Sequence, residues 1–112
     1  MKKIMIVAIL TLCSATLAFA DWNGWVKYGS TFVDGAEIKA YCVTCNKYEG
    51  TTTSHDGFWI LNEANGMKVG HHYHWIYGNK SGIGDGYTYI DWTYDPDDHH
   101  HGVMVYLDTM GK

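Results

Sequence analysis

Short runs in which apolar and polar residues alternate recur along this chain, and residues that favour turns separate them. The clearest run is 36–42, AEIKAYC, in which every second residue is small or apolar. This period of two predicts a half-buried strand with the small residues inward. Asp56-Gly57 joins the threonine-rich run 50–54 to the run 58–61, and it favours a tight hairpin turn because both residues tolerate positive φ.

The same pattern predicts seven short strands. They are expected at 25–28, 36–42, 50–54, 58–61, 68–77, 87–94 and 103–107. The segments 30–35, 79–86 and 95–102 contain clustered turn-forming residues and are expected to be loops. No segment has sustained helical periodicity, so the fold class is predicted to be all-β, a seven-stranded antiparallel β-sandwich.

The first twenty residues have the organisation of a secretory signal peptide. Lys2 and Lys3 precede an apolar stretch, 4–12, and Ala18-Phe19-Ala20 is a small-x-small cleavage site. Residues 1–20 are therefore predicted to be removed, which leaves a single domain over 21–112. That domain is expected to be exported to the periplasm, the cell surface or the medium. No later segment approaches the length of a membrane span, so none is expected in the mature chain.

The charge balance excludes some partners. The formal net charge is −4, and the chain contains no arginine. Arginine is the usual bidentate ligand of phosphate and guanine, so nucleic-acid binding is not expected, and neither is docking on anionic lipid. The acidic balance suits a soluble domain or one that attracts cations.

Several short motifs carry a resemblance to a known family. They are Gly24-Trp25-Val26, Asp34-Gly35-Ala36 at the start of a strand, Asp56-Gly57-Phe58 after the threonine-rich strand, and Gly66 before a long strand. Over about residues 24–77 and the last strand, the chain resembles the carboxypeptidase regulatory-like domain, a transthyretin-like (prealbumin-like) sandwich. The resemblance implies a non-catalytic module for adhesion, assembly or ligand binding, and it transfers no catalytic residue. The Cys-x-x-Cys, the histidine clusters and the tyrosine-rich sixth strand depart from the family pattern.

Cys42 and Cys45 are the only cysteines beyond the predicted signal peptide. An even number of cysteines in an exported protein first predicts a disulfide. Metal ligation and a redox role are the alternatives. A thioredoxin-type redox role requires the first cysteine at a helix N-terminus, where its pKa falls, and no helix is expected after Cys45.

Histidines form the second chemical signal. Strict alternation along the strand 68–77 places His72 and His74 on one face with Ile76, and His71, Tyr73, Trp75 and Tyr77 on the other. The loop that follows the sixth strand adds two carboxylates and three imidazoles, Asp97, Asp98, His99, His100 and His101. This mixture of nitrogen and oxygen donors suits Zn²⁺, Cu²⁺ or Ni²⁺ if the two segments lie close together. The alternative is that these histidines are surface polar residues that bind metals only weakly.

Aromatic residues make up 15% of the chain and include five tryptophans. Most are expected to fill the core of a small sandwich. Exposed rings would offer a surface on which sugars stack, and the candidates are Trp59, Trp75, Tyr87 and Tyr89. Catalysis has little support, because the adjacent side chains of Ser54-His55-Asp56 diverge and cannot form a triad.

The sequence therefore predicts an exported, non-catalytic binding or assembly module that associates with a protein partner or with itself, with edge strands as the natural route. Two alternatives remain. One is a small periplasmic protein that binds a transition metal through its histidines. The other is a carbohydrate-binding module that uses exposed aromatic rings.

Overall fold

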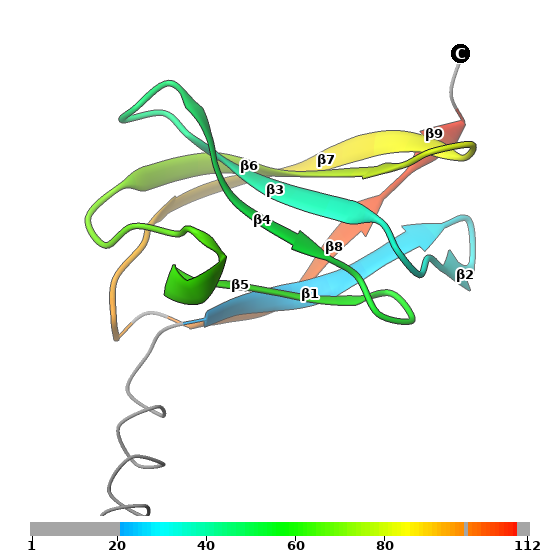
Figure 1. Cartoon of the computed structure of the whole chain (residues 1–112), viewed down its shortest axis with the longest axis horizontal. Helices are drawn as coiled ribbons and strands as arrows, with labels where there is room; N and C mark the ends of the chain where they lie inside the picture. Colours follow the sequence, from blue (N-terminus) through cyan, green and yellow to red (C-terminus); the bar gives the residue numbers. More distant parts are fainter. Residues whose placement is uncertain (1–20, 98, 110–112) are drawn as a thin grey trace, which may run out of the picture.

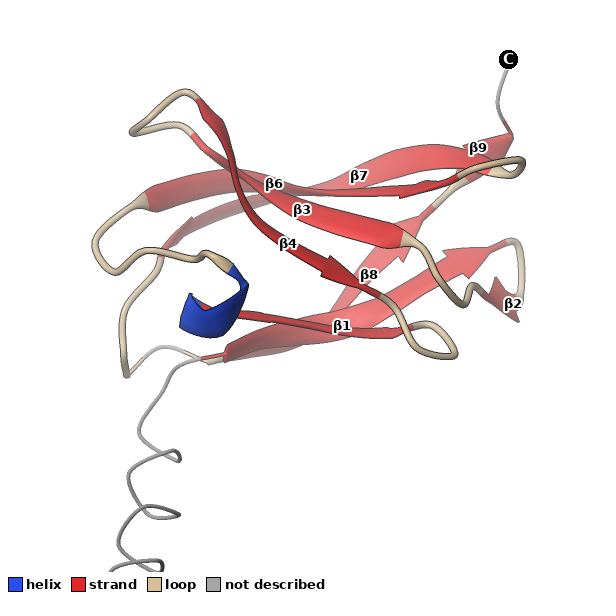
Figure 2. Ribbon diagram, in the orientation of Figure 1, coloured by secondary structure: helices blue, strands red, loops and turns tan. Residues whose placement is uncertain are grey.

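The computed structural model describes residues 21–97 and 99–109, and this part of the chain is all-β, with two sheets that face each other (Figures 1 and 2). The elements are β1 (Asp21–Tyr28), β2 (Thr31–Phe32), β3 (Glu37–Cys42), β4 (Lys47–Thr53), β5 (Phe58–Asn62), the 3-10 turn η1 (Glu63–Asn65), β6 (His72–Lys80), β7 (Gly84–Thr93), β8 (His100–Tyr106) and β9 (Asp108–Thr109). The predicted signal peptide and Asp98 lie outside the described residues. No helix in the described part of the chain is long and apolar enough to cross a membrane.

The first sheet is built around β1. Along one side, β1 pairs antiparallel with β5 and then with β2, and along the other side it pairs parallel with β8. A wholly antiparallel sandwich was therefore the wrong expectation for this sheet. The parallel pair joins strands from the two ends of the described chain, and residue alternation does not reveal the direction of such a long-range pairing. Gly24 permits the close approach, since a Cβ there would lie 1.8 Å from the Val103 carbonyl oxygen.

The second sheet has the order β4-β3-β6-β7-β9, and every pairing in it is antiparallel. The alternation predicted for β3 is confirmed, because Ile38, Ala40 and Cys42 are fully buried. The two-residue strands β2 and β9 were not predicted, because so short a pairing leaves no periodic pattern in the sequence.

Two of the predicted loops are shorter than expected. Residues 79–86 were expected to form one loop, but β6 continues to Lys80 and β7 begins at Gly84. The glycines that suggested a loop allow close packing instead, since a Cβ on Gly86 would lie 1.9 Å from the Tyr106 carbonyl oxygen. Similarly, β8 begins at His100, inside the segment 95–102.

The alternation predicted for β6 is wrong at its centre. Tyr73 and Ile76 are both fully buried, although an unbroken strand would place them on opposite faces. The pairing of β6 with β7 shifts register between Tyr73 and Trp75, as at a β-bulge. As a result, Tyr73 points into the core, whereas Trp75 lies on the outer face of the sheet with His74.

Aromatic rings occupy the centre of the core. Trp22 is fully buried and meets Tyr73, Trp92 and Tyr94 edge-on, with ring centroids 5.4–5.5 Å apart. Such edge contacts contribute about 0.5–1.5 kcal/mol each beyond the area they bury. The core therefore ties β1 of the first sheet to β6 and β7 of the second.

A buried hydroxyl fixes the corner between the two sheets. Ser54 is 1% exposed, and its Oγ donates to the Val33 carbonyl (2.6 Å) and accepts from the Ala36 N–H (2.9 Å). This serine therefore has a structural role, although it stands next to His55 and Asp56, the other two residue types of a catalytic triad.

We predict that Ser54→Ala lowers the free energy of unfolding by about 1–3 kcal/mol, because it leaves a buried carbonyl and a buried N–H without their partner. Urea denaturation measures the change, and the exposed Thr53→Ala is the matched control, with an expected change below about 0.5 kcal/mol. Equal denaturation midpoints for the two variants would contradict this role.

Candidate functional site

Two histidines and one aspartate meet on the outer face of the second sheet. His72 Nε2 lies 2.5 Å from Asp91 Oδ1, and His74 Nε2 lies 3.6 Å from the same oxygen. His72 and His74 come from β6, and Asp91 comes from the adjacent strand β7. We call these three residues the His-Asp site.

The strand pairing sets the geometry of the His-Asp site. His72 is opposite Thr93, and its Nδ1 lies 2.8 Å from the Thr93 hydroxyl oxygen, so its Nε2 is turned toward Asp91. An imidazole held through one ring nitrogen presents the other in a fixed direction, as metal-ligating histidines do. The site faces solvent, because Asp91 is exposed and both histidines are half-buried.

The donor set of the His-Asp site fits a transition metal. One ligand atom from each of the three residues lies within 4.8 Å of the others. Two imidazoles and one carboxylate on one side of an ion leave its remaining coordination positions open. The outward direction of the site makes those positions accessible to a ligand from outside the chain.

The loop predicted to complete one large histidine site does not do so. His100 stacks on Trp92, with centroids 3.6 Å apart and an interplanar angle of 2°. His99 and His101 lie beside Asp21 instead, with ring nitrogens 3.7 and 3.2 Å from its Oδ1. Consecutive side chains on an extended strand point to opposite sides, so three histidines in a row cannot share one ion.

A surface depression connects part of this loop to the His-Asp site. It has a volume of about 510 Å³ and is lined by Asp91, Trp92, Thr93, Asp95, Asp97 and His100. Asp97 therefore lies in the same depression as Asp91. His72 and His74 do not line it.

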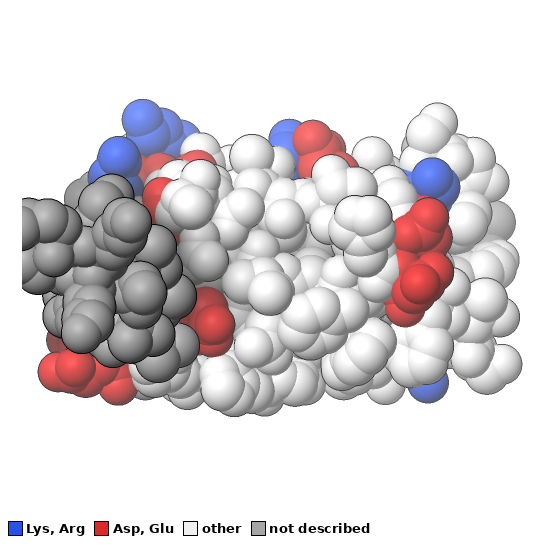
Figure 3. Space-filling model, turned by 60° about the horizontal axis from the view of Figure 1, so that its bottom comes forward, with Lys and Arg blue, Asp and Glu red and all other residues white. Residues whose placement is uncertain are grey.

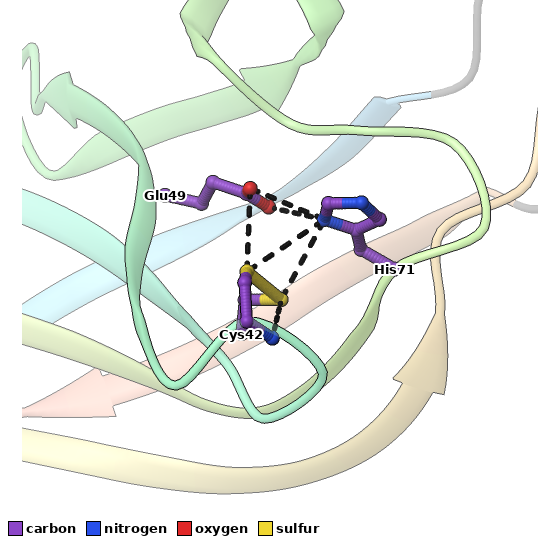
Figure 4. A group of neighbouring side chains, drawn as sticks. Cys42, Glu49 and His71 are labelled. Carbon is purple, nitrogen blue, oxygen red and sulfur yellow. Dashed lines mark hydrogen bonds and ion pairs between the residues drawn. A yellow bond between two sulfur atoms is a disulfide. The ribbon is translucent and has the colours of Figure 1, made fainter.

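A third cluster lies partly inside the sandwich, at the end of β3 (Figure 4). Cys42 and Cys45 form a disulfide, and the two sulfur atoms lie 3.6 and 3.7 Å from His71 Nδ1. The Glu49 side chain is 7% exposed, and its two oxygens lie 2.9 and 3.1 Å from the same nitrogen. We call these four residues the Cys-Glu-His cluster.

The surroundings of Glu49 keep it ionised. Burial acts to raise its pKa, but the hydrogen bonds from Tyr73 and His71, with the charges of His71 and Lys68, hold the pKa below its usual value. The Tyr73 hydroxyl donates to Glu49 Oε1 at 2.6 Å. Burial, followed by this hydrogen bond, raises the pKa of Tyr73. The charge on Glu49 is thus balanced by donors from two neighbouring residues of the chain.

Sequence reasoning missed Glu49 and His71 as partners of the cysteines. It placed His71 on the face opposite His72, but nothing in the pattern showed that the end of β3, at Cys42, lies next to His71. Glu49 is the extra residue of a register shift, since Ala40 pairs with Gly50 and Tyr41 pairs with Tyr48. The only sequence signal was a glutamate four residues after Cys45.

Six aromatic side chains cover the middle of the outer face of the second sheet. They are Tyr41, Tyr48, Trp75, Tyr77, Tyr87 and Tyr89, which we call the aromatic surface. Tyr87 is 70% exposed, whereas Tyr41 and Trp75 stack on each other with centroids 4.3 Å apart. A hollow of about 290 Å³ lies between Tyr48, Trp75, Tyr77 and Tyr87.

Trp59 was expected to be an exposed stacking ring, and this expectation is wrong. The side chain is 1% exposed, because the alternation of β5 turns Trp59 and Leu61 into the core and Ile60 outward.

Figure 3 brings forward the side of the molecule that carries β1 and β5, and charged side chains lie mainly toward its ends. The outer side of that sheet carries a smaller group of rings, Trp25, Phe32 and Phe58.

The separate environments of the histidines predict different effects on stability. We expect His100→Ala to lower the free energy of unfolding by about 0.5–1.5 kcal/mol, because it removes the ring stacked on Trp92. His99→Ala should change it by less than about 0.5 kcal/mol, because that ring is exposed and, among the described residues, contacts only the exposed His101 ring, with centroids 6.0 Å apart, and Asp21. Guanidinium denaturation measures both, and an equal effect of the two substitutions would rule out a packing role for His100.

Comparisons with known proteins do not assign these sites. No protein-family model matches the chain, and no curated protein matches it significantly. The resemblance to the carboxypeptidase regulatory-like domain therefore remains a prediction from its short motifs.

Proposed function

We propose that this chain is an exported, non-catalytic binding module of the transthyretin-like type that holds a transition metal ion at the His-Asp site. The observation that carries the proposal is the convergence of His72 Nε2 and His74 Nε2 on Asp91 Oδ1, at 2.5 and 3.6 Å. Two neighbouring strands supply the three donors, so the sheet itself fixes their spacing.

The donor spacing requires only small adjustments to bind an ion. Metal–ligand bonds of about 2.0–2.2 Å place tetrahedral donors roughly 3.3–3.6 Å apart. His74 already has nearly that separation from Asp91, whereas His72 must move away from the carboxylate by a side-chain rotation. Imidazole and carboxylate together favour Zn²⁺, Cu²⁺ or Ni²⁺ over Ca²⁺ or Mg²⁺, which prefer oxygen donors alone.

The open coordination positions support a binding role for the module. A metal held by three side chains at the surface can accept a further ligand from another molecule. The His-Asp site borders the aromatic surface, because His74 contacts Tyr89 with ring centroids 5.6 Å apart. We infer that the metal and the aromatic rings belong to one continuous binding face.

Calorimetric titration of the oxidised mature protein, residues 21–112, with Zn²⁺ or Ni²⁺ tests the proposal. We expect one equivalent to bind, and we expect His72→Ala to weaken that binding at least tenfold because it removes one of three ligands. His55→Ala is the matched control, since His55 is an exposed histidine in the turn before β5. His101→Ala separates this site from the group around Asp21. Loss of binding in His101→Ala but not in His72→Ala would contradict the proposal.

A second candidate function is association with a protein partner or another copy of the chain through the aromatic surface. Exposed tyrosine and tryptophan are enriched at the centres of protein interfaces. The ring orientations favour a protein over a sugar chain. The stack with Tyr41 covers one face of Trp75, and the exposed Tyr87 is tilted by 48° from Trp75, so the rings do not form a flat platform.

Sedimentation measured over a range of concentrations tests this second function. We expect concentration-dependent association of the mature protein, reduced at least tenfold by Tyr87→Ala. Tyr106→Ala is the control, because Tyr106 is similarly exposed on β8 of the other sheet. Quenching of tryptophan fluorescence by oligosaccharides, without association, would favour the carbohydrate-binding alternative instead.

A further inference from the structure

The Cys-Glu-His cluster has no part in the function proposed above. It places a largely buried carboxylate against an imidazole and one sulfur atom, and the second sulfur atom also lies beside the imidazole. We propose that Cys42, Cys45, Glu49 and His71 form a second metal site, for Zn²⁺, which becomes available when the disulfide is reduced. This site shares no residue with the His-Asp site.

Three of the distances between the donors match a tetrahedral zinc site, and two do not. Bonds of about 2.3 Å to sulfur and 2.0–2.1 Å to nitrogen and oxygen place tetrahedral ligands roughly 3.3–3.8 Å apart. The sulfur atoms lie 3.6 and 3.7 Å from His71 Nδ1, and Cys45 Sγ lies 3.3 Å from Glu49 Oε2. Glu49 and His71 are slightly closer together, at 2.9 Å. Glu49 and His71 must therefore move slightly apart, and the two sulfur atoms, now covalently joined, must separate.

The backbone around the cysteines holds Cys42 in place. The Cys45 N–H points at Cys42 Sγ, 3.2 Å away. Asn46 then takes the left-handed conformation, with φ 57°, and reverses the chain after Cys45. The disulfide lies beside the side chains of His71 and Glu49, as Figure 4 shows.

Glu49 is held by neighbours outside the cluster. The Lys68 N–H donates to the Tyr73 hydroxyl at 3.0 Å, and that hydroxyl donates to Glu49 at 2.6 Å. Residues that hold a ligand in this way are typical of metal sites and contribute to affinity. An ordered chain of donors therefore fixes Glu49 before any metal binds.

The step that opens the site is a balanced thiol–disulfide exchange. An external dithiol supplies two electrons and two protons and is itself oxidised to a disulfide, while the Cys42–Cys45 bond breaks to give two thiols. Zn²⁺ then displaces the two thiol protons to solvent, since the thiolate is the form that binds the metal. In the oxidised protein only Glu49 and His71 are available as ligands, so binding there is weak.

The decisive experiment uses the mature His72→Ala variant, because it lacks the His-Asp site. A water-soluble phosphine reduces the disulfide without competing strongly for zinc, and near-ultraviolet circular dichroism checks that the fold persists. We expect Zn²⁺ to bind one equivalent after reduction, at least 100-fold more tightly than before it. Co²⁺ in place of zinc should give thiolate-to-cobalt charge-transfer absorption.

Variants that keep the cysteines test the remaining ligands. His71→Asn should abolish tight binding, and Tyr73→Phe should weaken it about 10–100-fold by releasing Glu49. His55→Ala is again the matched control. The proposal is overturned by equal zinc affinity before and after reduction, by cobalt binding without thiolate absorption, or by loss of the fold on reduction. Because the parent variant lacks the His-Asp site, a negative result here concerns the Cys-Glu-His cluster alone and leaves the proposal for the His-Asp site unaffected.

Discussion

The register shift in β6 between Tyr73 and Trp75 decides which side chains of this strand enter the core and which lie on the outer face of the sheet. On one side of the shift, Tyr73 enters the core, contacts Trp22 and donates to Glu49. On the other side, Trp75 and Tyr77 lie on the outer face near His74. Without the shift, strict alternation would bring Tyr73, Trp75 and Tyr77 to the same face. The aromatic core and the aromatic surface therefore depend on one local irregularity.

The two candidate metal sites differ in the way the fold treats their carboxylates. Asp91 is 64% exposed in its side chain, and water stabilises its charge. Glu49 is buried and relies on hydrogen bonds from Tyr73 and His71. Removing one partner of a buried charge costs more than removing one partner of an exposed charge, because water cannot replace the lost interaction. The His-Asp site is thus suited to a metal ion that exchanges with the solvent. The Cys-Glu-His cluster is suited to a metal ion that is held tightly.

Local sequence patterns predicted the elements that depend on near neighbours. The period of two in 36–42 identified β3 and its buried residues. Asp56-Gly57 identified a tight turn before β5, but the hairpin expected there is wrong, because β4 and β5 lie in different sheets and do not pair. Features that depend on contacts between distant parts of the chain could not be predicted from the sequence. The parallel pairing of β1 with β8 requires knowledge of which strands meet, and Gly86 resembles a loop residue until the nearby backbone of β8 is known.

The same distinction holds for the sites. His72 and His74 were recognised from their spacing on one strand, but Asp91 was identified as their partner only through the pairing of β6 with β7. The three consecutive histidines suggested one cluster, whereas the structure separates His100 from His99 and His101. Glu49 and His71 join the cysteines through two different strand ends. The spacing of two residues along one strand can be read from the sequence, but the sequence does not show which strands lie side by side.

The central claim is that the outer face of the second sheet binds a metal ion between β6 and β7. Anomalous diffraction at the zinc absorption edge, from crystals of the oxidised mature protein grown with zinc, tests it most directly. The account predicts an anomalous peak about 2.0–2.1 Å from the Nε2 atoms of His72 and His74, with Asp91 as the third ligand. A peak found only beside Asp21, His99 and His101, or no protein-bound peak, would contradict it.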